Sequence, residues 1–387
     1  MNSLAKKFLA MLLLFPATLL GQNSSRPSKI EFIDLDKEVD RQVVVDREAN
    51  QYLGHPTTLL LEDGKTMLCV YPKGHGRGAI VYKRSSDGGL TWSDRLPTPE
   101  SWTTSKETPT IHRVIGPDGK KRIILFSGLF PARMAVSEDN GESWSELEKV
   151  GDWGGIVVMS SVFGLRSGPG HYMAMFHDDG RFIHAESKQS KPIEFNLMSV
   201  RSTDGGLTWS TPHSIIKSTR LHLCESGIIA SEDGSTLACL LRENSRTAPS
   251  QIIFSKDDGD TWSDPRPLPF DLCGDRHTGK YAPDGRLVIS YRRMCVKGES
   301  SSVHGDWVAW VGTFGDLIKG QPGQYLVRLK DNLKGTDCAY PGVETLPDGT
   351  FVVTTYGHWV VDQQPYILSV RFKLSELDSR AHQESSK

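Results

Sequence analysis

One octapeptide recurs along the chain and limits what the chain can fold into. The first copy runs from Ser85 to Trp92, and the others begin at Ser137, Ser202 and Ser255. All four copies fit the pattern S-x-D-x-G-x-[ST]-W, and a serine follows each of them. They start 52, 65 and 53 residues apart (137−85, 202−137 and 255−202). A period of about 50 residues indicates a repeated supersecondary unit, such as the blade of a propeller.

The residues of the octapeptide explain its role. Aspartate hydrogen-bonds nearby backbone amides and glycine accepts a positive φ, so the centre favours a tight turn, while tryptophan adds a large apolar surface. We therefore interpret the four aspartates as structural residues that hold blades together and do not touch a substrate: Asp87, Asp139, Asp204 and Asp257.

A second signal, an Asp-Gly type turn between two apolar runs, predicts β-hairpins. Six such turns follow one another: Asp63-Gly64, Asp118-Gly119, Gly168-Pro169-Gly170, Asp233-Gly234, Asp284-Gly285 and Asp348-Gly349. Long amphipathic helices are absent from the pattern, and only Leu374 to Ala381 suits a short helix. The chain is therefore predicted to be all-β, a six-bladed β-propeller of four-stranded antiparallel blades.

The N-terminus reads as a targeting segment. Lys6 and Lys7 precede an apolar run, Phe8 to Leu20, which is short for a membrane span and typical of a signal peptide. We expect export to the periplasm or the extracellular space, with no membrane insertion after cleavage. The predicted organisation is a signal peptide over 1–21, an N-terminal segment over 22–50, the propeller over 51–374 and a polar tail over 375–387. A strand at Ile30 to Ile33 is expected to pair with the last blade and close the ring.

Charge and cysteine content exclude some functions. The net charge of −2 argues against a nucleic-acid partner, which usually requires a basic face. The six cysteines of an exported chain permit disulfides, and we expect at most two. No zinc-type spacing of cysteine and histidine appears, so neither a metal nor a cofactor is predicted.

In a propeller the inner strands begin at one mouth of the central channel, so polar residues just before each apolar run are candidates for a site. Those that stand there, or in the adjoining connections, are His55, His75, Arg77, Glu107, His112, Glu225, Arg276 and Tyr340, with Arg242 and Arg292 at the ends of neighbouring runs. Arginine binds carboxylates through its bidentate fork. The predicted mouth therefore suits an anionic, hydroxylated ligand.

The octapeptide is identified as the Asp-box (BNR repeat) of the sialidase (neuraminidase) superfamily, and the resemblance runs from about residue 54 to 373. Tyr340 opens a segment that fits the superfamily pattern Y-x-x-x-x-x-[LP]-x-D-G, and Glu225 lies 17 residues before Arg242. The resemblance implies that Tyr340 is the nucleophile, that Glu225 takes its proton and that Arg242 holds the substrate carboxylate. A neutral phenol suits a carbon that already carries a carboxylate, which would repel an anionic nucleophile.

The sequence also departs from the superfamily. Gly54-His55-Pro56 stands where sialidases carry Arg-Ile-Pro, and the acid/base aspartate of the first blade is missing. His75 or His55 could donate the proton instead, since imidazole titrates near neutrality. Arg77, Arg276 or Arg292 could complete the carboxylate site, with His112 and Glu107 as further substrate contacts. The chain resembles a divergent branch.

Three functions remain open at this point. The first is a secreted exo-glycosidase that hydrolyses a terminal sialic acid, or a related 2-keto-3-deoxy sugar acid, from a sialylated or other acidic glycan. The second is a uronic-acid polysaccharide lyase, because Tyr, His and Arg together can neutralise a carboxylate and abstract the adjacent proton. The third is a non-catalytic glycan-binding propeller, which the lost arginine and aspartate favour.

Overall fold

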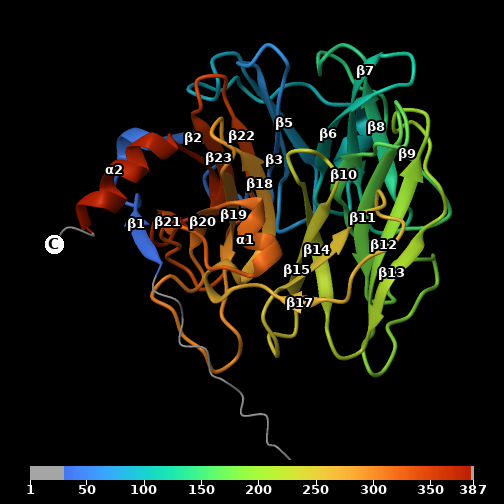
Figure 1. The fold of residues 1–387 in the computed structure, drawn as a ribbon. Helices are drawn as coiled ribbons and strands as arrows, with labels where there is room; N and C mark the ends of the chain where they lie inside the picture. The colour runs from blue at the N-terminus through green and yellow to red at the C-terminus, as the bar shows by residue number, and fades with distance from the viewer. Residues whose placement is uncertain (1–29, 385–387) are drawn as a thin grey trace, which may run out of the picture.

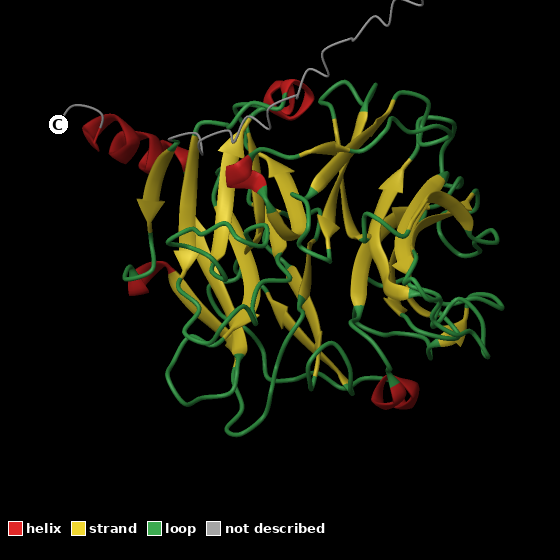
Figure 2. Cartoon of the chain, turned by 90° about the horizontal axis from the view of Figure 1, so that it is seen from below, coloured by secondary structure: helices red, strands yellow, loops and turns green. Residues whose placement is uncertain are grey.

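Six sheets stand in a ring and form a six-bladed β-propeller (Figure 1). The computed structural model describes residues 30–384, so the expected signal peptide lies outside the described residues. Strands and loops make up almost all of the chain, and the few helices lie around the outside (Figure 2). The prediction of an all-β, six-bladed propeller is confirmed.

Each blade begins with an inner strand and continues outward in chain order (Figure 1). The first three blades contain β3 (Thr57–Leu60), β4 (Met67–Pro72) and β5 (Ile80–Ser85); β6 (Thr110–Ile115), β7 (Lys121–Ser127), β8 (Arg133–Ser137) and β9 (Glu148–Lys149); and β10 (Ile156–Gly164), β11 (Tyr172–Asp178), β12 (Phe195–Ser202) and β13 (His213–Ser218). The next two contain β14 (Leu223–Ala230), β15 (Leu237–Glu243), β16 (Gln251–Ser255) and β17 (Arg266–Pro267); and β18 (Gly274–Tyr281), β19 (Leu287–Arg293), β20 (Trp307–Gly312) and β21 (Tyr325–Lys330). The last contains β22 (Gly342–Thr345), β23 (Phe351–Gly357) and β24 (Tyr366–Phe372).

The N-terminal strands complete two different blades. β2 (Gln42–Asp46) pairs antiparallel with β24 and is the fourth strand of the last blade. β1 (Glu31–Asp34) instead pairs in parallel with β21 as a fifth strand of blade five. The expectation that the strand at Ile30 to Ile33 pairs with the last blade is therefore wrong. Tertiary contacts explain its position, because Arg328 on β21 hydrogen-bonds Asp34 and Lys330 forms an ion pair with Asp36.

Blade five therefore has one strand more than the predicted four, whereas blade one has one fewer, with three strands. Its chain still follows the path of a fourth strand, since the Ser93 and Leu96 N–H groups donate to the carbonyls of Arg84 and Tyr82. The remaining four blades have four strands each.

The octapeptides follow the third strand of blades one to four, because Ser85, Ser137, Ser202 and Ser255 end β5, β8, β12 and β16. Successive strands alternate in direction, so these turns lie on the face opposite to the starts of the inner strands. In the first copy the Asp87 carboxylate accepts from the Leu90 and Thr91 N–H groups and from the Thr91 hydroxyl. The second copy also joins two blades, since the Tyr82 hydroxyl donates to the Gly141 carbonyl at 2.8 Å.

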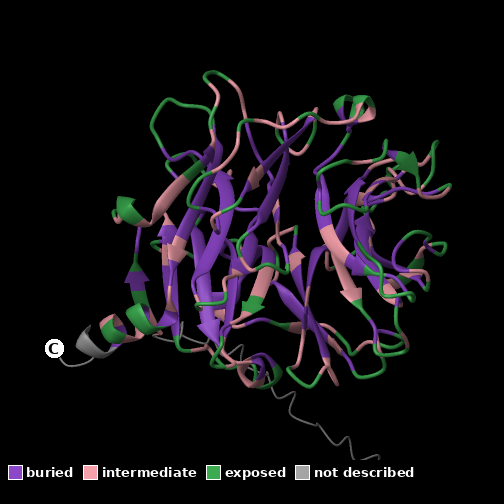
Figure 3. Cartoon of the chain, turned by 90° about the horizontal axis from the view of Figure 1, so that it is seen from above, coloured by how far each residue is buried: buried purple, intermediate pink, exposed green. Residues whose placement is uncertain are grey.

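The core lies between the blades, where the inner and middle strands are buried over most of their length (Figure 3). All six cysteines are buried and free, so none forms a disulfide. The helices are η1 (Val39–Arg41), η2 (Glu100–Thr104), η3 (Phe270–Leu272), α1 (Phe314–Lys319) and α2 (Leu374–Glu384). Helix α2 includes residues assigned above to a polar tail, and its Leu374 and Leu377 are buried. None of the helices within residues 30–384 has the length and apolar character needed to cross a membrane.

Candidate active site

The inner strands begin in an unusual backbone conformation at the mouth. Five non-glycine residues there have positive φ values: His55 (54°), Val157 (52°), Glu225 (48°), Arg276 (57°) and Ala339 (57°). The pairing register also shifts near the starts of β10, β14 and β18. Bulges redirect side chains, and left-handed non-glycine residues are enriched at functional sites. The backbone therefore marks this mouth as the candidate site.

Tyr340, Glu225 and Arg242 meet at this mouth, from blades six and four. The Tyr340 hydroxyl donates to Glu225 Oε1 at 2.5 Å, and Arg242 Nη1 donates to the same oxygen at 2.7 Å. Arg242 Nη1 also lies 3.4 Å from the Tyr340 hydroxyl. Tyr340 and Glu225 are 9% and 5% exposed, so water screens this contact poorly.

The surroundings give the two groups opposite protonation states at neutral pH. Burial, followed by the negative charge of Glu225, raises the pKa of Tyr340 well above its usual value. Burial also acts to raise the pKa of Glu225, but the Arg242 charge and the Tyr340 hydrogen bond outweigh it and leave that pKa below its usual value. Tyr340 is thus a phenol, and Glu225 is a carboxylate that can accept its proton.

A buried carboxylate, Asp275, organises three arginines around the pair. Its oxygens lie 3.4 Å from Arg242 Nε, 2.5 Å from Arg246 Nη2 and 2.6 Å from Arg292 Nη2. Burial acts to raise the pKa of Asp275, but the three guanidinium charges outweigh burial and leave that pKa below its usual value. Asp275 is therefore ionised. Arg276 is also buried at the mouth, where its Nη1 donates to the Ser160 carbonyl at 2.8 Å.

His55 is packed into the wall of the site. Its ring centroid lies 4.3 Å from that of Tyr340, and its ring stacks on Tyr356 at 4.5 Å. The Gly76 N–H donates to its Nδ1 at 3.0 Å, which leaves Nε2 to contact the Tyr356 hydroxyl at 3.2 Å. Burial lowers the pKa of His55 well below its usual value. The ring is therefore neutral, with both nitrogens engaged.

His75 is in a different position, at the edge of the site and 66% exposed. Its ring lies edge-on to His55 with centroids 4.7 Å apart. Nδ1 lies 2.7 Å from the Tyr52 hydroxyl and 3.4 Å from Asp337 Oδ1, whereas Nε2 forms no hydrogen bond or ion pair with a residue between 30 and 384. The exposed nitrogen can face a ligand.

Asp337 is the centre of a network in which sequence reasoning missed two members, Tyr52 and Tyr356. Both tyrosine hydroxyls donate to its carboxylate, at 2.8 and 3.1 Å. His358 Nε2 lies 3.2 Å from its other oxygen. Burial acts to raise the pKa of Asp337, but hydrogen bonds from His75, Tyr52 and His358 lower it overall. Tyr52 precedes blade one and Tyr356 lies near the end of β23, where no local pattern marks either tyrosine.

Three predicted site residues form no hydrogen bond to Tyr340 or Glu225 in the described part of the chain, although the charge of Glu225 helps to raise the pKa of Glu107. Glu107 is buried, and both its oxygens accept backbone N–H groups, from Val157 and from Val158. His112 lies further along β6. Arg77 projects from the connection between β4 and β5 beside His75.

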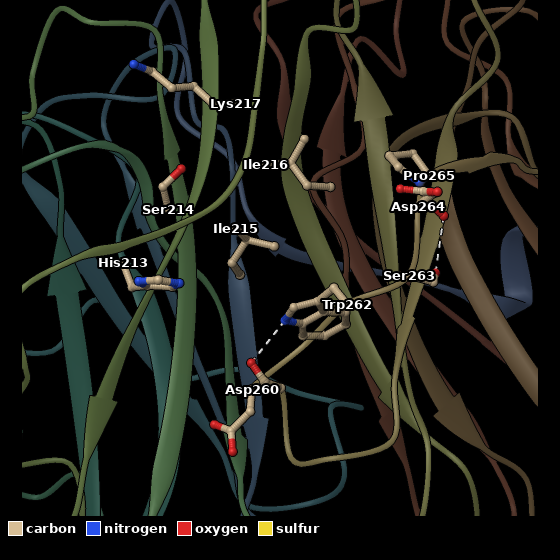
Figure 4. A pocket seen from close by; sticks show the side chains of 11 residues that line it. His213, Ser214, Ile215, Ile216, Lys217, Asp260, Trp262, Ser263, Asp264 and Pro265 are labelled. Atoms are coloured by element: carbon tan, nitrogen blue, oxygen red, sulfur yellow. Dashed lines mark hydrogen bonds between the residues drawn. The ribbon is translucent and has the colours of Figure 1, made fainter.

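Another groove lies at the outside of the ring, between β13 and the octapeptide of blade four. It is about 380 Å³ in volume, and His213, Lys217, Asp260 and Trp262 are among its lining residues (Figure 4). Because an outermost strand forms one wall, this groove is remote from the inner strands. Within residues 30–384 no cluster of three or more His, Cys, Asp or Glu is arranged to hold a metal ion.

Comparisons with known proteins agree with the fold. Residues 126–299 match the family model of the BNR repeat-like domain. A protein of unknown function from Dyadobacter fermentans superimposes with a TM-score of 0.66 at 14% identity, covering 86% of this chain and 97% of the other. The NanB sialidase of Streptococcus pneumoniae superimposes with a TM-score of 0.58 at 12% identity, covering 86% of this chain and 70% of the other. The α-L-arabinofuranosidase Arb93A of Fusarium graminearum superimposes with a TM-score of 0.59 at 13% identity, covering 87% of this chain and 98% of the other. A search of curated proteins returns no match.

The class is therefore a sialidase-type, six-bladed propeller, a fold that glycosidases with different substrates share. At identities of 12 to 14%, these superpositions show the fold alone. The function has to be argued from the residues of the site.

Proposed function

We propose that the protein is an exo-glycosidase that hydrolyses a terminal sialic acid, or a related 2-keto-3-deoxy sugar acid, from a glycan. The observation that supports this most directly is the buried 2.5 Å hydrogen bond from Tyr340 to Glu225, with Arg242 beside it. A phenol paired with a carboxylate is an activated nucleophile. The export expected from residues 1–21 fits a glycan substrate outside the cytoplasm.

The charge of the mouth supports an acidic sugar. Four arginines, Arg242, Arg246, Arg276 and Arg292, lie near three ionised carboxylates, Glu225, Asp275 and Asp337. The site therefore has an excess of positive charge, which a substrate carboxylate would balance. Arg242 is the best placed to bind it, since its guanidinium lies beside both members of the reacting pair.

In the proposed first step, the Tyr340 oxygen attacks the anomeric carbon and its proton passes to Glu225. The bond from that carbon to the leaving-group oxygen breaks, and His75 protonates this oxygen. In the second step a water, deprotonated by His75, attacks the same carbon, while the tyrosine oxygen leaves and takes its proton back from Glu225. The enzyme returns to its starting state, and the bond has been hydrolysed.

The geometry favours His75 over His55 as the proton donor. His55 has both ring nitrogens engaged and is neutral, so it has no acidic imidazolium proton to give at the mouth. His75 is exposed, and Tyr52 and Asp337 hold its Nδ1, which leaves Nε2 available to a ligand. An aspartate behind a histidine orients the ring and stabilises its charged form.

The proposal is tested by incubating the protein with sialylated glycans and fluorogenic sialosides and measuring released sugar acid. Tyr340→Phe should reduce kcat by at least about 10³-fold, because the nucleophile is lost while the packing remains. Tyr281→Phe is the matched control, since Tyr281 lies at the far end of an inner strand and donates to the Ala230 carbonyl. Full activity of Tyr340→Phe would refute the tyrosine mechanism.

Parallel incubations, with a uronic-acid polymer and with glycans over long times, separate the other candidate functions. A polysaccharide lyase would produce an unsaturated uronate from a uronic-acid polymer, which absorbs in the ultraviolet, whereas hydrolysis leaves no such signal. Binding of glycan without turnover over long incubation would indicate a non-catalytic propeller.

A further inference from the structure

A second cavity lies on the face of the propeller that carries the mouth. It has a volume of about 720 Å³, and its lining residues are Lys73, Gly74, His75, Arg77, Gly78, Ser105, Lys106 and Leu129. These residues come from the connection between β4 and β5, the segment before β6 and the connection after β7. Because the second strand of each blade ends where the first begins, all three segments lie at the mouth, between blades one and two.

The cavity is positively charged. Three of its eight lining residues are lysine or arginine, one is histidine, and none is a carboxylate. Lys73 forms an ion pair with Glu48 at 3.1 Å, and the Lys106 Nζ donates to the Phe130 carbonyl. No hydrogen bond or ion pair is recorded for the Arg77 guanidinium within residues 30–384. By contrast, the outer groove of Figure 4 contains Asp260 and Asp264.

Lys73, His75 and Arg77 come from one loop whose turn requires glycine. Lys73-Gly74-His75-Gly76-Arg77-Gly78 alternates basic residues with glycines, and the Lys73 N–H closes it by donating to the Ala79 carbonyl. Gly78 has a φ of 115°, and a Cβ there would lie 2.5 Å from the Lys73 carbonyl oxygen. Only glycine fits that position, so the turn remains tight and its basic side chains project outward.

The position of the cavity relates it to the reaction centre. In a ring of six blades, blades one and two lie opposite blades four and five, which carry Arg242 and Arg292. His75 belongs both to the cavity and to the edge of the site, where it contacts His55 next to Tyr340. A sugar acid held by Arg242 would therefore have its leaving group directed over His75 into this cavity.

We propose that the cavity is a binding site for the leaving-group side of the glycan and that it selects a sugar carrying a second negative charge, a sulfate ester or a uronate. The assignment to the leaving group rests on the proposed function, whereas the preference for an anionic sugar rests on the charge of the cavity alone. Arg77 and Lys106 provide the attraction and Ser105 lies beside them. Both cations are exposed, so salt should weaken binding.

The test measures binding by calorimetry or NMR, without turnover, on the full chain and on its Tyr340→Phe variant. The probes are 6-sulfo-N-acetyllactosamine, a glucuronate-containing disaccharide, unmodified N-acetyllactosamine and inorganic sulfate. The charged sugars should bind about tenfold more tightly than the neutral one at low salt, and Tyr340→Phe should leave this preference unchanged. The sulfated and glucuronate arms decide which anion is preferred.

The double variant Arg77→Gln/Lys106→Gln should reduce the preference to within about twofold. The control, Lys149→Gln/Lys217→Gln, removes two exposed cations from the outer strands β9 and β13 and should retain it. Equal binding of charged and neutral sugars, a preference that survives the double variant, or binding of inorganic sulfate as tight as that of the sulfated sugar would overturn the proposal. A preserved preference without any release of sugar acid would instead refute the exo-glycosidase function and leave the anionic-sugar site standing.

Discussion

The buried carboxyl of Glu107 should make the stability of the propeller depend on pH, and Glu107→Gln should remove that dependence. Glu107 is 7% exposed and accepts the N–H groups of Val157 and Val158, at the strained start of β10. Burial raises its pKa from 4.5 to about 8, against the opposing effect of these two N–H groups. At pH 7 the folded chain therefore keeps a proton on Glu107 that the unfolded chain has released.

The sign and size follow from proton linkage. Between pH 4.5 and about 8 the folded chain keeps the Glu107 proton and the unfolded chain does not. The free energy of unfolding therefore falls as the pH rises through this range. At about 1.4 kcal/mol per pH unit, the loss between pH 6 and 8 is about 2 kcal/mol, and it levels off above pH 8. The amide side chain introduced by Glu107→Gln would mimic the protonated acid in shape and charge and would not titrate.

The assay is urea unfolding of the wild type and of Glu107→Gln at pH 6, 7, 8 and 9. We expect the variant to gain about 2 kcal/mol relative to the wild type between pH 6 and 8, because only the wild type has to ionise a buried group. Glu148→Gln, at an exposed position on β9, should run parallel to the wild type throughout. Parallel profiles for Glu107→Gln as well would show that Glu107 is already ionised in the folded state and would refute the reasoning.

Two further predictions concern opposite faces of the molecule. Asp337→Asn should lower kcat by about tenfold with little change in KM, because the carboxylate that holds the His75 ring in place is lost; an unchanged kcat would argue that Asp337 is only structural. Asp87→Ala removes an acceptor of four hydrogen bonds on the far face, so it should lower the free energy of unfolding by about 1–3 kcal/mol, seen as a lower Tm, while kcat/KM stays within about twofold.

The sequence allowed the blade count to be predicted because its signals are local. An Asp-Gly turn or an Asp-box needs only neighbouring residues to form, so each appears in the sequence where it appears in the fold. The pairing of β1 could not be predicted in this way. Open strand edges are alike in their backbone groups, and contacts between residues about 294 positions apart, such as Arg328 with Asp34, decide which edge is used.

The candidate site divides along the same line. Tyr340 and Glu225 could be identified because their segments match patterns of the sialidase superfamily, and the structure brings them to 2.5 Å. The sequence left His55 and His75 as equal candidates for the proton donor. Their difference arises from tertiary contacts, because the Gly76 N–H and Tyr356 engage His55, while His75 stays exposed beside Asp337. Tyr52 and Tyr356 could not be predicted as site residues, because only the closed ring brings their hydroxyl groups to Asp337.

The closed ring also explains how this backbone can be maintained. Each non-glycine residue in the left-handed region costs about 1–2 kcal/mol, so the five at the starts of the inner strands together cost roughly as much as a small domain's net stability. The buried surfaces between blades, which include Tyr340 itself, and the Asp-boxes supply the stabilisation, and the Asp-boxes do so on the face away from the site residues. The propeller thus separates the two tasks, with strain and chemistry at the mouth and hydrogen-bonded turns at the opposite end, which is why changes to the two faces should affect different measurements.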